Sequence, residues 1–400
     1  MAGPLEGIRV VELGFWVAGP AAAGIMADWG ADVVKLEPPD GDPMRGLFLT
    51  AAGVDVPINP PFELDNRGKR SLVLNLQHAE GRAAAHRLLA DADVLVTNLR
   101  LPALAKLGLD FPTVHALNQR LVYCALTGYG ADGPDRDRPA YDVGAFWARA
   151  GVAMSLTPKG SPPPQQRGGM GDHTTAIAAV SAVCAALVAR QRTGVGQFVC
   201  TSLLRTGVYV LGWDVNTRLR LGRVESPYDR HHIPNPLVNC YQAADGRWFW
   251  LLGLQADRHW PDLVRAIERP ELRDDPRFAE IRVRREHAEA CVATLDAIFA
   301  GQPLAHWMAA FDRAGMWWAP VQTIGEMLDD PQARAGGVFT SVEVAEGRAD
   351  MVASPAEFAG TPAAPPAMAP EHGQHTETVL LELGYDWEQI AALREAGALG

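Results

Sequence analysis

The stretch "IRVVELGFWVAGPAAAGIMADWGADVVKLE", residues 8–37, changes its hydrophobic period twice. A β-branched run comes first, a segment of small residues with helical spacing follows, and "ADVVKLE" predicts a second strand. Two strands joined by a helical crossover form a βαβ unit, in which the strands are parallel and the connection is right-handed. This stretch therefore predicts the start of a parallel sheet.

The same alternation continues along the chain. Further strands are predicted at "RSLVLNL" (70–76), "DVLVTNL" (93–99) and "LVYCALTGYG" (121–130), with a helix at "AEGRAAAHRLLADA" (79–92). This rhythm is typical of a doubly wound parallel sheet with helices on both faces. We predict the α/β class, with a Rossmann-like parallel sheet in the first half of the chain.

The second half has a different pattern. Residues 200–220 predict one more helix, and the polar, proline-bearing "ESPYDRHHIPNP" (225–236) is typical of a linker. "LVNCYQAADGRWFWLLG" (237–253) has two apolar runs around an Asp-Gly turn and predicts a β-hairpin. Amphipathic helices follow, which together predict a smaller α+β domain: residues 257–268, 284–299 and 303–314.

Beyond residue 330 the chain again predicts regular elements. "GGVFTSVEV" (336–344) predicts a strand, "TPAAPPAMAP" (361–370) a proline-rich loop, and "HTETVLLELGY" (375–385) a helix.

The charge and cysteine content exclude several classes of protein. A net charge of -11 argues against a duplex nucleic-acid binder, which needs a basic face. The five cysteines are odd in number and widely spaced, which indicates neither a disulfide framework nor a zinc site. The N-terminus carries Glu6 and Glu12 where an export signal would be basic and then apolar. We expect a cytoplasmic location.

The most apolar helical stretch is "AIAAVSAVCAALVA", residues 176–189. At about 14 residues it is shorter than the ~20 that cross a bilayer. We therefore expect a buried helix and no membrane partner.

Two nucleotide-binding motifs are incomplete. Gly14, Gly19 and Gly24 are spaced too widely for the GxGxxG turn of a dinucleotide site, although Glu37 lies where an acidic residue would follow. "NRGKRS" (66–71) lacks the upstream glycine and the Lys-Ser/Thr pair of a triphosphate loop. A βαβ unit that needs small residues for close packing explains the first pattern.

Basic residues gather in two turns of the chain. Arg67, Lys69 and Arg70 precede a predicted strand, and Arg100 and Lys106 follow the next one. Such runs are most often solvated charge. The functional alternative is a binding place for phosphates on an otherwise acidic protein. Other catalytic patterns are missing, because the chain has no HExxH and no GxSxG sequence.

Asp172 lies in "QQRGGMGDHTTA" (165–176), between glycines and the predicted start of the apolar helix. From position alone a helix cap is the commoner role for such an aspartate. Gly168, Gly169 and Gly171 favour a functional role, because they let the backbone approach a ligand closely. A helix N-terminus also presents free N–H groups to developing negative charge.

A carboxylate at this position could act as a nucleophile. Its reference pKa is about 3.9, so it is ionised at pH 7 unless burial raises that pKa by about three units. Unlike a serine, it needs no histidine to activate it. It could attack an acyl thioester and form a mixed anhydride.

The ordered motifs resemble those of the family III CoA-transferases, which include formyl-CoA:oxalate and carnitine CoA-transferases. The resemblance runs along nearly the whole chain and continues in "DDPRFAE", "WAPVQTIGEMLDDPQARAGG" and "HTETVLLELGY". In the first half it rests on residues 4–46, "NRGKRSLVLNL", "VTNLRLPALAKLGLD", "LTGYGADGP", "YDVGAF" and "GDHTTAIAAVSAVCAALVARQRTGVGQ".

The resemblance implies a fold and a domain order. It implies a large Rossmann-like CoA-binding domain (1–205), a linker (206–235), a small α+β domain (236–325) and a C-terminal segment (326–400) that returns to the large domain. Two such chains would form an interlocked homodimer.

The resemblance also assigns a site. The catalytic aspartate falls on Asp172, which would pass through acyl-anhydride and aspartyl-CoA thioester states before CoA reaches an acceptor carboxylate. The ligands implied are an acyl-CoA donor, a carboxylic acid acceptor and no metal. Contacts with coenzyme A would fall on Val17, Ala18, Leu74, Asn75, Leu76, Gln77, Asn98, Leu99, Arg100, Lys106, Ala140 and Tyr141.

Some positions depart from the family pattern. Pro38 replaces a basic residue for CoA, "NLRLP" replaces Asn-Phe-Arg-Pro-Gly, and the glycine-rich lid of formyl-CoA transferases is missing. Oxalate or formate specificity is therefore not indicated, and the donor and acceptor acids stay open. Four aromatic residues are candidates for an apolar acyl site, although large aromatics more often belong to a core: Phe15, Trp16, Trp147 and Trp213.

Two alternative functions remain. The family includes α-methylacyl-CoA racemases, which pair the aspartate with a histidine, but Tyr141 occupies that histidine's place and is a poor base at neutral pH. His173 could substitute only if the start of the helix turned it toward the substrate. The alternative of another class is a non-catalytic CoA-binding protein in which Asp172 is only a cap.

Overall fold

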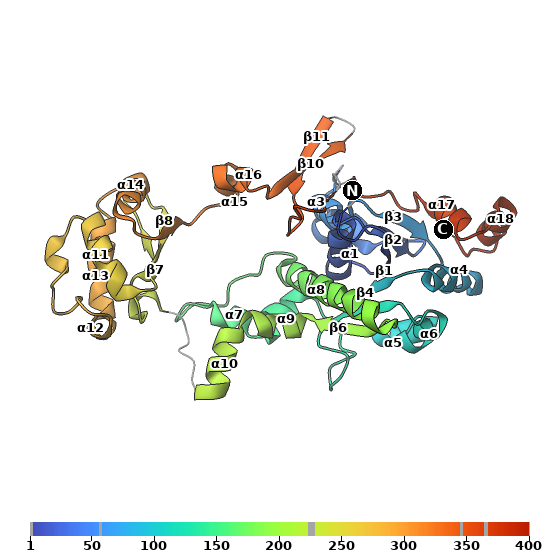
Figure 1. Ribbon diagram of the computed structural model, residues 1–400, viewed down its shortest axis with the longest axis horizontal. Coiled ribbons are helices and arrows are strands. Elements are labelled where there is room, and N and C mark those ends of the chain that lie inside the picture. Colours follow the sequence, from blue (N-terminus) through green and yellow to red (C-terminus); the bar gives the residue numbers. More distant parts are fainter. Residues whose placement is uncertain (1–2, 56–57, 223–228, 345–346, 364–366, 400) are drawn as a thin grey trace. The chain divides into compact units, whose positions relative to one another are not determined.

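A six-stranded parallel sheet forms the centre of the computed structural model, which describes residues 3–55, 58–222, 229–344, 347–363 and 367–399. Its order, β3-β2-β1-β4-β5-β6, is that of a doubly wound fold (Figure 1). The chain order reverses between β1 and β4, where such folds bind ligands. The strands are β1 (Arg9–Leu13), β2 (Asp32–Glu37), β3 (Arg70–Val73), β4 (Val94–Thr97), β5 (Val122–Thr127) and β6 (Phe198–Ser202).

The five strands predicted from the first half of the sequence are confirmed, but residues 200–220 differ from the prediction. Instead of one helix, they contain the end of β6 and two helices, α9 (Leu203–Val210) and α10 (Gly212–Leu221). Strand β6 pairs with β5 from Tyr123↔Phe198 to Thr127↔Ser202. It is short and follows a polar turn, so its strand character depends on that pairing more than on a local pattern.

Both faces of the sheet are covered by helices. Alternate residues of a strand point to opposite faces, so Val10 packs toward α1 (Ala18–Asp28) and α8 (Met170–Thr193), whereas Val11 packs toward the other face. That other face carries α4 (Ala79–Ala90), α5 (Leu101–Leu107), α6 (Phe111–Leu117), α17 (Thr376–Glu382) and α18 (Trp387–Glu395).

The C-terminal segment packs beside the first strands of the sheet. The hydroxyl of Thr376 accepts a hydrogen bond from the main-chain N–H of Val73 at 3.1 Å, and α17 and α18, red in Figure 1, contribute Leu380 and Ile390 to the core. An antiparallel hairpin precedes them: β10 (Phe339–Val344) and β11 (Gly347–Val352). The predicted strand at 336–344 and helix at 375–385 are confirmed.

The chain divides into two compact units. The first contains residues 1–153, 165–224 and 335–400, and the second contains residues 154–164 and 225–334. The first also holds α2 (Leu47–Ala52), α3 (Pro60–Asn66) and two irregular helical turns, η1 (Pro43–Gly46) and η2 (Val143–Arg149).

The second unit combines a small antiparallel sheet with helices. The predicted hairpin is confirmed as β7 and β8, and β9 adds a third strand to it. Phe249, Trp260, Phe299 and Phe311 lie in its core. Its elements are α7 (Val152–Ser155, which begins in the first unit), η3 (Arg230–His232), β7 (Val238–Gln242), β8 (Trp248–Leu252), α11 (Ala256–Ala266), η4 (Pro270–Leu272), α12 (Ile281–Glu286), α13 (Ala288–Phe299), α14 (Leu304–Ala314), β9 (Trp318–Pro320), α15 (Ile324–Leu328) and α16 (Pro331–Ala335).

Two predicted connections fall partly outside the described residues. The predicted linker, 206–235, includes residues 223–228, and the predicted proline-rich loop, 361–370, includes residues 364–366. Residues 206–221 of that linker lie in α9 and α10. The domain limits stay predictions.

Helix α8 is apolar along most of its length. Among the helices of the described ranges, it alone has the length and composition to cross a membrane, with 39% of its most apolar window buried. Ala176, Ala179, Val180 and Val183 pack against the sheet and α1, as the core helix of a globular protein does. The helix predicted to be buried is thus buried on one side only, and Ile177 and Val188 are exposed.

Candidate active site

A cavity of about 710 Å³ lies beside the turn that follows β1. Trp16 and Val17 of that turn line it, together with Tyr141, Asp172 and His173. Segments far apart in the sequence complete its wall: α2, α3 and strand β11. Its place at the carboxyl end of β1, next to the reversal of strand order, is where doubly wound folds bind small molecules.

Asp172 is the third residue of α8, and its carboxylate lines this cavity. The helix begins at Met170, and its N-cap is Gly169, whose φ is 74°. No side-chain capping bond forms there. The interpretation of Asp172 as a cap is therefore wrong, and within the described residues its carboxylate accepts no capping hydrogen bond.

The glycines before Asp172 have different structural roles. Gly169 adopts the left-handed conformation that glycine tolerates best. Gly171 is required by packing, because a Cβ atom there would lie 2.6 Å from Cγ of Phe146. Gly168 has open space around its Cα. Gly168 and Gly169 line the cavity, where close approach of a ligand is possible, whereas Gly171 is buried and is explained by packing.

The surroundings of Asp172 oppose its ionisation. Burial and, to a smaller extent, the charge of Asp142 raise the pKa of Asp172 to about 7, against the opposite effect of His173. The carboxylate of Asp142 accepts hydrogen bonds from Nε2 of Gln166 at 2.9 Å and from the main-chain N–H of Gly171 at 3.3 Å. The sequence-based expectation of a fully ionised nucleophile is thus corrected, because burial supplies the shift of about three units.

His173 forms a pair with Asp65 from α3. The two side chains are joined by a hydrogen bond of 3.0 Å between Nε2 of His173 and Oδ1 of Asp65. This bond raises the pKa of His173, while burial raises the pKa of Asp65 against the effect of His173. Because His173 lines the cavity, the start of the helix does turn it toward the site.

Trp16 is held in a strained conformation at the edge of the cavity. Its φ is 66°, which a residue with a side chain rarely adopts. Its main-chain N–H donates to Oδ1 of Asp42 at 3.1 Å, and Oδ2 of Asp42 accepts from Nζ of Lys35 at 2.8 Å. The turn after β1 is therefore fixed by a buried ion pair rather than by glycine.

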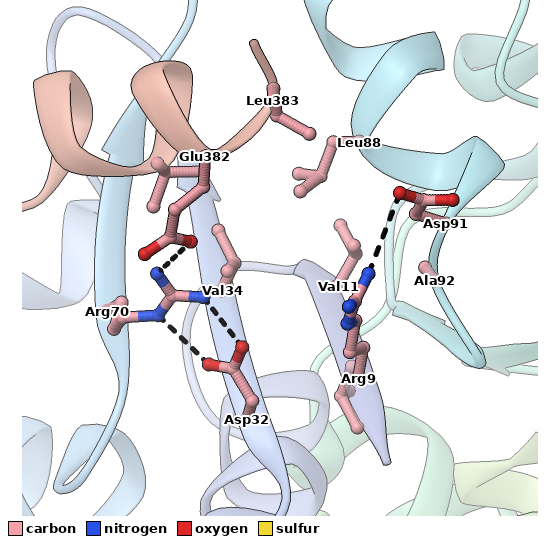
Figure 2. Close-up of a pocket in the computed structure, with 12 residues that line it drawn as sticks. Arg9, Val11, Asp32, Val34, Arg70, Leu88, Asp91, Ala92, Glu382 and Leu383 are labelled. Atoms are coloured by element: carbon pink, nitrogen blue, oxygen red, sulfur yellow. Dashed lines mark hydrogen bonds and ion pairs between the residues drawn. The ribbon is translucent and has the colours of Figure 1, made fainter. Parts of the chain in front are cut away.

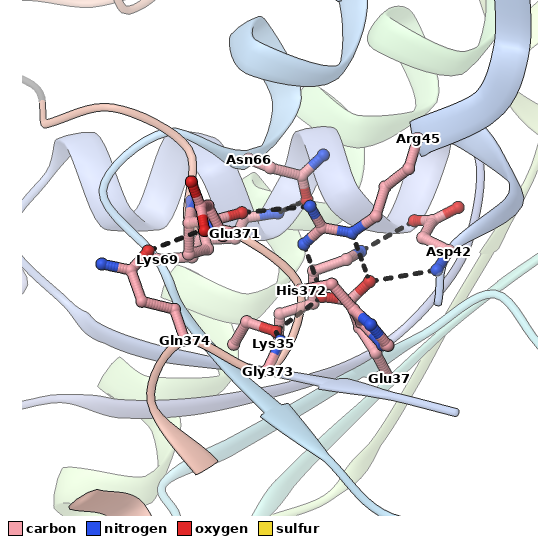
Figure 3. A network of polar contacts seen from close by, with 12 residues as sticks. Lys35, Glu37, Asp42, Arg45, Asn66, Lys69, Glu371, His372, Gly373 and Gln374 are labelled. Atoms are coloured by element: carbon pink, nitrogen blue, oxygen red, sulfur yellow. Dashed lines mark hydrogen bonds and ion pairs between the residues drawn. The ribbon is translucent and has the colours of Figure 1, made fainter. Parts of the chain in front are cut away.

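Lys35 belongs to a buried polar network, defined here as Glu12, Lys35, Glu37, Asp42, Arg45 and Lys69 (Figure 3). The two oxygens of Glu12 accept from Lys35 at 2.7 Å and from Lys69 at 2.6 Å. Glu37 accepts from both nitrogen positions of the Arg45 fork. Nζ of Lys69 also donates to Oδ1 of Asn66.

The charges of this network compensate one another. Burial lowers the pKa of Lys35, but Glu12, Asp42 and Glu37 raise it by more. Burial favours the neutral form of Glu37, yet Arg45 and Lys35 bring its pKa down to about 2. Burial lowers the pKa of Lys69 to about 8 despite Glu12. The network is a structural support of the site and leaves no free cation.

The basic turn at Arg67, Lys69 and Arg70 has neither of the two roles weighed from the sequence. Arg67 is buried and pairs with Asp28 at 2.6 Å, Lys69 is fully buried, and Arg70 pairs with Asp32 and Glu382. These residues bind other parts of the same chain, so they are neither solvated charge nor a phosphate site. No local pattern predicts these partners, because the acids lie up to 312 residues away in the chain.

The residues predicted to contact coenzyme A divide into two groups. Val17 and Tyr141 line the cavity with Asp172, and Ala18 and Ala140 adjoin them in the chain. The other predicted residues do not line the cavity. Leu74 is fully buried in the core, and Leu76 and Leu99 pack against that core. The side chain of Asn75 donates a hydrogen bond to the carbonyl of Gly397, and that of Asn98 donates to the carbonyl of Phe15. Three residues are exposed, the last two around α5: Gln77, Arg100 and Lys106.

The aromatic residues considered for an acyl site also lie in different parts of the structure. Trp16 lines the cavity and meets Tyr141 edge-on at 6.0 Å. Trp147 is buried in a core cluster, and Trp213 is exposed on α10. Asp65 and Asp142 are site residues that sequence reasoning missed. They lie 107 and 30 residues before Asp172, and no local pattern connects them with it.

A second cavity, of about 560 Å³, lies at the opposite, amino-terminal edge of the sheet (Figure 2). Arg70 binds both oxygens of Asp32 and also Glu382 of α17. Arg9 pairs with Asp91 at 3.6 Å. The charges here join α17 to the sheet, and the carboxylates of Asp32, Glu382 and Asp91 are each paired with an arginine. Within the described ranges, no group of acidic, histidine and cysteine side chains could hold a metal ion.

Comparison with known proteins gives a consistent assignment. Residues 5–376 match the model of CoA-transferase family III. The chain is 34% identical to (R)-2-hydroxy-4-methylpentanoate CoA-transferase of Clostridioides difficile, covering 98% of each chain, and 33% identical to succinate–glutarate CoA-transferase of Agrobacterium fabrum, covering 95% and 96%. A CAIB/BAIF family protein from Brucella suis has a similar structure, with a TM-score of 0.82, 30% identity and coverage of 96% and 100%.

Proposed function

The chain belongs to CoA-transferase family III, and on that premise we propose that it transfers coenzyme A from an acyl-CoA to a free carboxylic acid through a covalent intermediate on Asp172. The observation that carries this proposal is the position of Asp172. Its carboxylate is not used as a helix cap, and it lines a cavity at the ligand-binding end of the sheet.

The proposed reaction needs only carboxylates and thiolates. An oxygen of Asp172 attacks the thioester carbonyl, the C–S bond breaks, and a mixed anhydride and the CoA thiolate result. The thiolate then attacks the aspartyl carbonyl, which releases the donor acid and leaves an aspartyl-CoA thioester. The acceptor carboxylate repeats both steps in reverse order, which forms the new acyl-CoA and restores Asp172.

The charges around Asp172 support this cycle. Burial with Asp142 nearby makes the carboxylate a stronger base than an exposed aspartate, and His173, tied to Asp65, supplies an opposite charge beside it. When Asp172 becomes an anhydride or a thioester it is neutral, so the repulsion from Asp142 ends. The site thus stabilises the covalent states relative to the free carboxylate.

Trapping the intermediate tests the proposal. Hydroxylamine added during turnover converts an acylated aspartate into a hydroxamate, which mass spectrometry of the Asp172 peptide detects. The same treatment without acyl-CoA is the control and should leave the peptide unchanged. An active enzyme with an unmodified Asp172 peptide would contradict covalent catalysis.

The contacts with coenzyme A are part of the proposal. We place the acyl end of the coenzyme beside Val17, Ala18, Ala140 and Tyr141, and the rest along residues 75–77 and 98–100 and Lys106, while Leu74, buried in the core, is excluded. Arg100 and Lys106 are exposed cations suited to phosphate groups. Replacing both with alanine should raise KM for acyl-CoA about tenfold and leave KM for the acyl-pantetheine, which has no nucleotide phosphates, unchanged. Equal effects on both would contradict this placement.

A second candidate, epimerisation at the α-carbon of an acyl-CoA, is favoured by one observation. His173 lines the same cavity as Asp172, so two groups able to exchange protons face one space. A 2-methylacyl-CoA incubated in heavy water without any acceptor acid should gain deuterium at the α-carbon if this activity exists. A product without deuterium would leave transfer as the sole chemistry of the site.

We also propose that the chain is a homodimer, interlocked as the resemblance implies. Large apolar side chains are exposed on α9 and α10, including Tyr209 (85%), Trp213 (87%) and Leu219 (75%). Light scattering should give twice the chain mass. Because interlocked chains separate only on unfolding, replacing Trp213 and Leu219 with glutamate should lower the yield of dimer after refolding from denaturant, whereas Leu254→Glu, on the second unit, should not. A yield of dimer that the first pair leaves unchanged would contradict the use of this face.

A cytoplasmic location completes the proposal. All five cysteines are free thiols, and Cys124 and Cys291 are buried. Free thiols persist in a reducing compartment. Cell fractionation checks this location, and recovery of the protein with exported proteins would contradict it.

A further inference from the structure

The walls of the cavity beside Asp172 are mostly apolar. Leu47 of α2, Leu64 of α3 and Met351 and Val352 of β11 contribute aliphatic or thioether side chains, and Trp16 and Tyr141 contribute rings. A volume of about 710 Å³ is that of a typical small-molecule pocket. It is far larger than an acetyl or formyl group requires.

The ionisable groups that line this cavity are nearly all acidic. They comprise one histidine and five carboxylic acids, and among the described lining residues there is no arginine or lysine: His173, Glu63, Asp65, Asp142, Asp172 and Asp350. The histidine is tied to Asp65 by its Nε2 atom. A second negative charge on a substrate would therefore find several like charges and no free cation.

Four cations of the neighbouring segments are already committed to acids of the chain, whereas Arg167 and Arg348, which adjoin lining residues in the sequence, are exposed and do not line the cavity. Lys35 and Lys69 are fully buried and share Glu12, and Arg67 is buried against Asp28. Arg45 binds both oxygens of Glu37. Releasing any of them toward a ligand would leave a buried carboxylate without its partner, which is strongly unfavourable. The polarity of the cavity is thus set by the fold.

We propose that the acyl group handled at Asp172 is that of a monocarboxylic acid with an uncharged, apolar chain, and that dicarboxylic acids are rejected. This inference rests on the proposed function. An apolar chain gains free energy by leaving water for these walls. The free carboxylate of a dicarboxylic half-thioester would lose its hydration beside Glu63, Asp142 and Asp350 without gaining a partner.

The comparison of two donors of equal size tests the inference. 4-Methylpentanoyl-CoA and succinyl-CoA differ only in that an isopropyl group replaces a carboxylate, with the same number of non-hydrogen atoms. With one acceptor acid, kcat/KM should be at least about 100-fold higher for the branched donor, which is the order of discrimination that an unpaired buried charge produces. Equal values, or a preference for succinyl-CoA, would overturn the inference.

A substitution in the wall tests the effect of charge by the change in donor preference, whatever the preference of the wild-type enzyme is. Met351→Lys places a cation of similar length in the wall and should raise the succinyl to 4-methylpentanoyl ratio of kcat/KM at least about tenfold. Met351→Gln, neutral and of the same length, is the matched control and should change the ratio by less than about threefold. An equal change in both variants would overturn the role of charge.

The outcomes separate the two proposals. If neither donor transfers CoA and hydroxylamine traps nothing on Asp172, the proposed function fails. If CoA transfer and the trapped intermediate are observed but succinyl-CoA is the better donor, the proposed function stands and only the assignment of the substrate class fails.

Discussion

Two clusters of carboxylates lie close to each other in the first unit and differ in their partners. Glu12, Glu37 and Asp42 are fully buried, and each accepts hydrogen bonds from a lysine or an arginine. Asp142 and Asp172 are half-buried and have no cationic partner among the described residues other than the nearby His173. In the first cluster, Arg45 and Lys35 hold the pKa of Glu37 at about 2, whereas in the second cluster burial raises the pKa of Asp172 to about 7. Ion pairs with lysine and arginine hold the first cluster in place, whereas the carboxylate of Asp172, which has no such pair, stays available for reaction.

The largest effect should come from Asp172→Asn. Asparagine cannot form the anhydride, so kcat should fall by at least about 1,000-fold. The variant should also be more stable at pH 8. The folded pKa of about 7 exceeds the unfolded value of 3.8, so this carboxyl group lowers stability progressively from about pH 4 to pH 7 and by a constant amount above pH 7, where its removal should add about 1–2 kcal/mol. Transfer assays and chemical denaturation measure both.

The chain offers a control for this variant. Glu388 lies in the first turn of α18, as Asp172 lies in that of α8, and it is exposed. Glu388→Gln should keep both activity and stability. A loss of activity in Glu388→Gln, or an active Asp172→Asn enzyme, would contradict the functional difference between the two positions.

The next effect should come from breaking the paired cluster with Lys35→Met. This change leaves Glu12 and Asp42 with a missing partner, and removing one member of a buried ion pair costs about 3–5 kcal/mol. Because Asp42 also holds the N–H of Trp16, KM for acyl-CoA should rise as well. Denaturation and steady-state kinetics measure the two effects, and a stable variant with unchanged KM would contradict this role.

The pH dependence should differ between the two clusters. With a pKa of about 7, Asp172 is about a tenth ionised at pH 6 and about nine-tenths ionised at pH 8, so kcat/KM should rise about tenfold over that range. Asp142→Asn removes a like charge and should move the midpoint to lower pH. The paired Glu37, with a pKa of about 2, should not contribute to the change in kcat/KM between pH 6 and pH 8. A profile that is flat between pH 6 and 8 would contradict the shift.

The smallest effect should come from Arg70→Met, at the other edge of the sheet. Arg70 pairs with Asp32 and Glu382, but these acids are about half exposed, so water replaces the lost partner. We expect a loss of at most about 1 kcal/mol in the free energy of unfolding and no change in kcat. A loss as large as that of Lys35→Met would contradict the distinction between buried and exposed pairs.

Much of the fold could be predicted from local patterns. Strands β1 to β5, the β7–β8 hairpin and the amphipathic helices follow from hydrophobic period and turn residues. Strand β6 could not be predicted from a local pattern, because it depends on pairing with β5. Asp172, Val17 and Tyr141 were placed at the site by the family resemblance, whereas Asp65 and Asp142 required the fold to bring them there.

The sequence by itself determined the parallel α/β sheet and the position of a carboxylate at the start of an apolar helix, since both depend on residues close together in the chain. Only the tertiary structure decided which charges are paired. Lys69 could face solvent or Glu12, and Asp172 could be a cap or a free group, with no difference in local sequence. Ion pairing and burial depend on distances between residues far apart in the chain, and folding alone sets those distances.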